Sequence, residues 1–121
     1  MTPFGAILQK AVEGTPGAVG GAFADPQGEM VDAFAAGYDP HEWAVLTAHF
    51  GVIFAQLQSL FGTWHFGGAE YFIAQHARLG VIVHVVDRGY FALFAVSAPN
   101  PIAHALIAAQ TAARALYQEM Q

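Results

Sequence analysis

The nineteen residues from Trp43 to Phe61 contain no Asp, Glu, Lys or Arg. An uncharged run of this length can form either a helix that spans a bilayer or a long helix that lies against a protein core. Thr47 and Gln56 interrupt the apolar run, and no basic residue follows before Arg78, so the flanking charges typical of a membrane span are missing. We therefore expect a helix of a folded domain and no membrane span.

The residues around this run mark where the helix begins and ends. Asp39 is a side chain suited to capping a helix N-terminus, and Pro40 follows it at the first helical position. Gly62 supplies a stop, so the helix is predicted to run to about Phe61. One arc of this helix is apolar and is expected to pack on a sheet; it contains Trp43, Leu46, Phe50, Phe54, Leu57 and Phe61, with Ile53 and Leu60 at its edge.

Nearly opposite that arc lies a row of five small residues, Ala44, Ala48, Gly51, Ala55 and Ser59. Such a row is either a set of exposed helix formers or a surface that a second helix can approach closely. A glycine inside a helix costs about 0.5 to 1 kcal/mol relative to alanine, which favours a packing reason for Gly51. We expect this small-residue row to be the interface of a homodimer or a larger assembly, in which the helix meets its symmetry mate.

Caps, turns and periodicity predict the remaining elements. A first helix starts at Thr2-Pro3 and ends near Gly14, and two strands over 17–24 and 29–35 flank a turn at 25–28. Three strands over 70–76, 79–87 and 90–96 form a meander, and a last helix starts at Asn100-Pro101. The strand over 79–87 is apolar on both faces, so helices must cover both sides of the sheet. The expected order is α-β-β-α-β-β-β-α in one domain over 1–121.

The sequence offers little material for catalysis or for cofactor and metal binding. Four basic residues and a net charge of -5 disfavour nucleic acid. The six histidines lack metal-ligand spacing, and no phosphate-binding loop or activated serine is present, so we predict no catalytic, cofactor or metal residues. Gly17, Gly20 and Gly21 are expected to serve close backbone packing. Charged residues make up only 11% of the chain, so some apolar surface is expected to meet a partner. The N-terminal residues do not read as a secretory leader, so we expect a cytoplasmic protein.

The stretch from Pro16 to Ala22, followed by Asp25 and Gly28 at the first turn, resembles the roadblock family. The long helix, the meander and the closing helix extend the resemblance over nearly the whole chain. It implies a profilin-like α/β sandwich, in which helices lie on both faces of a five-stranded antiparallel sheet. It also implies a homodimer that joins two sheets edge to edge with the central helices side by side. Roadblock proteins are typically regulators or platforms without catalysis, and some bacterial members act on a Ras-like small GTPase of polarity and gliding motility.

We expect a protein partner, in the first place a small GTPase, to bind beside the small-residue row, at His41, Val45, His49, Val52 and Gln56. No arginine lies on this helix, so any effect on a GTPase would not use an arginine finger. Two alternatives stay open: an adaptor that holds a peptide or motor subunit at a sheet edge or helix groove, and a small-molecule sensor. The rings of Trp64 and Phe66 are either a lid over the core or an anchor for a partner.

Overall fold

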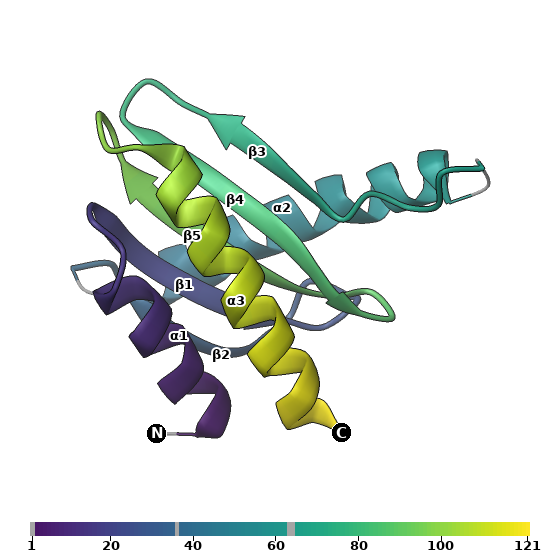
Figure 1. The fold of residues 1–121 in the computed structure, drawn as a ribbon, viewed down its shortest axis with the longest axis horizontal. Coiled ribbons are helices and arrows are strands. Elements are labelled where there is room, and N and C mark those ends of the chain that lie inside the picture. Colours follow the sequence, from purple (N-terminus) through teal and green to yellow (C-terminus); the bar gives the residue numbers. More distant parts are fainter. Residues whose placement is uncertain (1, 36, 63–64) are drawn as a thin grey trace.

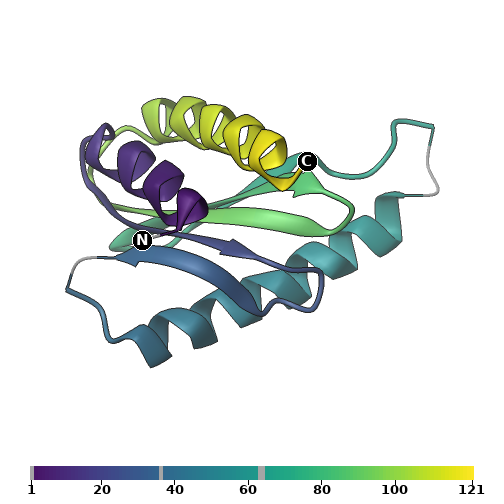
Figure 2. The ribbon, with the colours of Figure 1, turned by 90° about the horizontal axis from the view of Figure 1, so that it is seen from below.

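The computed structural model describes residues 2–35, 37–62 and 65–121, and its helices and strands follow the predicted order. The helices are α1 (Pro3–Glu13), α2 (Pro40–Phe61) and α3 (Ile102–Met120), and the strands are β1 (Ala18–Ala24), β2 (Met30–Ala35), β3 (Tyr71–Gln75), β4 (Leu79–Asp87) and β5 (Tyr90–Ser97). The strands form one antiparallel sheet in the order β2-β1-β5-β4-β3. Helices α1 and α3 cover one face of this sheet and α2 covers the other (Figures 1 and 2).

A separate apolar core lies on each face of the sheet. Leu8 of α1 and Leu116 of α3 pack with Ile82 on one face, while Trp43 and Phe54 of α2 belong to the cluster on the other. The predicted covering of both faces of the middle strand is confirmed, because Val81, Ile82 and Val83 of β4 are all buried. A strand that is buried on both faces has no room for the usual alternation with polar residues.

The helix starts follow the capping residues in two of three cases. The Thr2 hydroxyl accepts a hydrogen bond from the backbone N–H of Gly5 at 3.1 Å, and the Asp39 carboxylate accepts one from Glu42 at 3.2 Å. Helix α3 instead begins at Ile102, and its N-cap residue makes no side-chain capping bond. Asn100 does not cap this helix, and its side-chain amide instead donates to the carbonyl of Ser97 at 2.9 Å.

Two consecutive glycines of β1 admit an aromatic ring on each face of the sheet. A methyl group at Gly20 would lie 2.9 Å from Cζ2 of Trp43, and one at Gly21 would lie 2.7 Å from Cε1 of Phe94. Because neighbouring side chains of a strand point to opposite faces, each glycine makes space on its own side. The expected role of these glycines in close packing is confirmed.

The apolar arc of α2 packs on the sheet over only part of its length. Trp43, Phe50 and Phe54 are buried as predicted, but Phe61 is 42% exposed and Leu60 is 65% exposed. The C-terminal part of α2 runs past the margin of the sheet, so no strand lies beneath its last turn (Figures 1 and 2). The prediction that Phe61 packs on the sheet was wrong, because helical periodicity gives the direction of a side chain and not the width of the sheet below it.

Candidate functional site

The outer face of α2 is uncharged over most of its length and carries several exposed apolar side chains. From Trp43 to Phe61 the helix carries no formal charge, and its exposed large side chains include Val45 at 41%, Val52 at 57% and Ile53 at 42%. Single exposed apolar residues are common on protein surfaces, whereas several apolar side chains gathered on one uncharged face favour an interaction site. The residues predicted to bind a partner all lie exposed on this face: His41, Val45, His49, Val52 and Gln56.

The small-residue row of α2 lies partly against its own chain. Gly51 is buried, and a methyl group placed on it would lie 3.0 Å from the Cα of Gly28 and 3.1 Å from Cζ of Phe91. Ala48 packs on the same β1–β2 turn, since its backbone lies 3.4 Å from a methyl group placed on Gly28. The packing reason for Gly51 is therefore this turn, which corrects the expectation that it meets a second helix. No contact tests the rest of the predicted interface, Ala44, Ala55 and Ser59.

Replacing Gly51 with leucine is expected to lower the free energy of unfolding by about 1 to 3 kcal/mol, because the side chain would overpack the contact with Gly28 and Phe91. Chemical denaturation measures this difference. Ala55 belongs to the same row but is exposed, so the same change there is expected to stay within about 0.5 kcal/mol. Equal losses at the two positions would contradict the intramolecular role of Gly51.

The two flanks of α2 face different parts of the sheet. Phe50 stacks on Phe72 of β3 at a ring separation of 6.1 Å, while Gly51 faces Gly28 on the opposite flank. At 100° per residue, Ile53 and Leu57 lie on the same flank as Phe50. The large aliphatic side chains of α2 therefore line the side toward β3, and the small ones line the side toward the β1–β2 turn.

A side-chain amide fixes the chain where it returns from α2 to the sheet. Gln58 donates from Nε2 to the carbonyl of Ala69 at 2.8 Å and accepts from the Ala69 N–H at 2.8 Å. A methyl group at Gly68 would collide with Gln58 Oε1, so a larger residue there would displace the Gln58 amide. Phe66 lies just before this contact and is 89% exposed, so the core-lid interpretation is wrong for Phe66. Trp64 lies outside the described residues.

The two edges of the sheet differ in how open they are. At the β2 edge Val31 is an extra residue between Met30 and Asp32, and the Thr2 hydroxyl donates a hydrogen bond to the Asp32 carboxylate. A bulge of this kind discourages pairing with another strand. Strand β3 pairs with β4 without interruption and has no bulge. Its Tyr71 and Ile73 are each 39% exposed, so β3 is the regular, apolar and open edge.

The histidines do not assemble a metal site in the part of the chain that the structure describes, where no three His, Asp or Glu side chains gather closely enough to hold an ion. His41 and His49 are exposed on α2. His84 pairs with Tyr71 across the β3–β4 hairpin, and their rings stack at 5.8 Å. Its Nδ1 lies 2.8 Å from the carbonyl of Val85, which fixes the ring in this position.

By length and composition, one helix among the described residues is suited to crossing a membrane. This is α2, whose most apolar window has a mean hydropathy of 1.4, with 22% of the window buried inside the molecule. The core helix of a soluble protein passes the same test. Here Trp43, Phe50 and Phe54 pack on the sheet, while Val52 and Leu60 are among the apolar side chains of α2 that stay exposed.

Solved structures with the same fold come from roadblock proteins. MglB of Myxococcus xanthus superposes with a TM-score of 0.86 at 10% identity, covering 99% of this chain and 96% of that one. The gliding protein MglB of Thermus thermophilus gives 0.82 at 17% identity, covering 93% and 84%. A Roadblock/LC7 domain of Streptomyces avermitilis gives 0.83 at 12% identity, covering 95% of each chain.

Neither a protein-family model nor a curated protein matches the chain by sequence. The likeness therefore lies in the arrangement of the elements. With the helix and strand order, the antiparallel sheet and these superpositions in agreement, the chain has the roadblock fold.

Proposed function

We propose that this protein is a non-enzymatic, homodimeric regulator of the roadblock type, which presents α2 to a Ras-like small GTPase or a related signalling partner. The observation that carries the proposal is that one flank of α2, with Ile53 exposed, lies beside the open β3 edge, where Phe50 stacks on Phe72. The shared fold with gliding proteins such as MglB supports a regulator of this kind. We place the protein in the cytoplasm, without a membrane span.

The proposed dimer pairs β3 with its symmetry mate across a twofold axis. An antiparallel pair of identical strands satisfies such an axis, and it gives each unpaired backbone N–H and C=O of the edge a partner. The same axis brings together the flanks of α2 that face β3, with Ile53 and Leu60 exposed at 42% and 65%. Helix α2 extends beyond its own sheet, so its last turn would lie over the partner's sheet and bury the Leu60 side chain (Figure 2).

The proposed partner surface is the row His41, Val45, His49, Val52 and Gln56, which points away from the sheet between the two flanks. Replacing Val52 with aspartate places a charge at the centre of this row, on a side chain that is 57% exposed. Because a charge is costly to bury against an apolar partner, binding of a cognate small GTPase is expected to weaken at least about tenfold. Titration calorimetry with purified Ras-like GTPases, loaded with GTP or GDP analogues, measures this change.

The matched control is Ile107→Asp on α3, an apolar residue of similar exposure (63%) on the opposite side of the sheet. Its affinity for the GTPase is expected to equal that of the wild type. Binding that differs between the two nucleotide states supports the regulator. Capture of a peptide or motor subunit with no nucleotide dependence would favour the adaptor instead, and a lack of binding to every Ras-like GTPase would contradict the proposal.

A further inference from the structure

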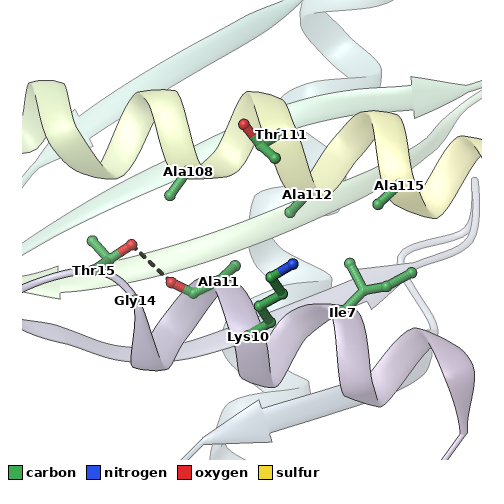
Figure 3. Close-up of a pocket in the computed structure, with 9 residues that line it drawn as sticks. All are labelled: Ile7, Lys10, Ala11, Gly14, Thr15, Ala108, Thr111, Ala112 and Ala115. Carbon is green, nitrogen blue, oxygen red and sulfur yellow. Dashed lines mark hydrogen bonds between the residues drawn. The ribbon is translucent and has the colours of Figure 1, made fainter.

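A groove separates α1 from α3 on the face of the sheet opposite α2 (Figure 3). Its volume is about 320 Å³, and small side chains create it: Ala11 on α1 and Ala108, Ala112 and Ala115 on α3. Larger side chains at these positions would fill the space between the two helices. The groove is separate from the α2 surface, since the sheet lies between them, and no residue of β3 lines it.

The polar side chains of the groove walls already form hydrogen bonds within the chain, with one exception. The Thr15 hydroxyl donates to the carbonyl of Ala11 at 2.7 Å, and the Thr111 hydroxyl donates to that of Ile107 at 3.1 Å. Both acceptors are backbone carbonyls of the residue four positions earlier, so the hydroxyl hydrogens are not available to a bound ligand. The walls therefore offer an apolar environment, in which water would find few hydrogen-bonding partners.

Lys10 is the exception, and it is also the only charged residue among those that line the groove. Its side chain extends from α1 toward α3 (Figure 3). Within the described residues the one ion pair joins Arg88 to Asp87, so Lys10 has no carboxylate partner there. An apolar groove with a single cation at its rim matches a ligand that has an apolar body and one anionic group.

We propose that the α1–α3 groove binds an apolar monocarboxylate, such as a medium-chain fatty acid, with its carboxylate on Lys10 and its chain along the alanines. A volume of about 320 Å³ is that of a small-molecule pocket and leaves no room for a docked helix, which is about 10 to 12 Å across. This ligand site lies apart from the proposed GTPase-binding surface on α2.

Calorimetric titration of the purified chain with octanoate, decanoate and dodecanoate below their micellar concentrations tests the proposal. We expect one site per chain, with affinity rising about two- to fourfold for each added methylene until the groove is full. Decanol lacks the charge and is expected to bind about threefold more weakly than decanoate, since an exposed ion pair contributes modestly. Lys10→Met should remove this preference, while Arg114→Met, which changes a cation outside the groove, should keep it.

Ala108→Leu fills the groove at a half-buried position and is expected to weaken decanoate binding at least tenfold. The matched change Ala103→Leu on the same helix lies outside the groove and should leave binding unchanged. If Ala108→Leu binds as well as the wild type, the fatty acid binds elsewhere, for instance on the apolar face of α2, and the proposal is wrong. Equal affinities for decanol and decanoate, or no saturable binding of any chain length, would also overturn it.

Discussion

Replacing Trp43 with alanine is expected to lower the free energy of unfolding by about 3 to 5 kcal/mol, a large share of the stability of a typical domain. Trp43 is 2% exposed and lies at the N-terminal end of α2, where its ring enters the space left by Gly20. Tyr38 covers it from outside at a ring separation of 5.4 Å. Removing the indole leaves a cavity that strands β1 and β2 cannot close. Urea unfolding followed by circular dichroism measures the loss.

Phe66→Ala is the matched control for this experiment, because it also truncates an aromatic ring but at a position that is 89% exposed. Its free energy of unfolding is expected to stay within about 0.5 kcal/mol of the wild type. A loss below about 1 kcal/mol for Trp43→Ala would show that α2 is not anchored on the sheet as described.

The double change Ile53→Lys and Ile73→Lys is expected to convert the protein to a monomer. Ile53 is 42% exposed and Ile73 is 39% exposed in the single chain. The aliphatic part of a lysine at either position can therefore lie along the surface while its ammonium group stays in water. In the proposed dimer each lysine would face its symmetry mate at the twofold axis. Burying like charges there should raise the dimer dissociation constant at least about a hundredfold, or about 2.7 kcal/mol.

The control for this variant carries its two substitutions at the other edge of the sheet and on the helix α3, which covers the other face. Val31 at the β2 bulge and Ile107 on α3 are exposed at 45% and 63%, and replacing both with lysine adds the same charge. We expect that variant to remain dimeric. Size-exclusion chromatography with light scattering separates the outcomes, and dissociation of both variants alike would point to a general charge effect and contradict the β3 interface.

Local signals predicted the elements of the fold well, because each start and stop depends on residues next to it. Helix α2 begins after Asp39 and ends before Gly62, as expected, and strands β3, β4 and β5 lie close to their predicted ranges. The predicted start of α3 at Asn100-Pro101 is slightly early. The Asn100 amide donates to the carbonyl of Ser97, and such local hydrogen bonds of asparagine compete with helix capping.

The candidate site was predicted less completely, because its parts depend on distant segments. Periodicity placed Val52 and its neighbours on an exposed row, which the structure agrees with. It could not reveal that Gly28 of a distant turn lies against Gly51, or that α2 extends past the sheet at Leu60. That β3 is an open edge follows from the order of the strands in the sheet, which local sequence signals do not give.

Sedimentation equilibrium of the unmodified protein over micromolar concentrations tests the central claim, that α2 and β3 form a twofold interface. The account predicts a mass of twice the 12.9 kDa chain, falling to one chain for the variant with lysines at Ile53 and Ile73. A mass of 12.9 kDa for the unmodified protein at every concentration would contradict it.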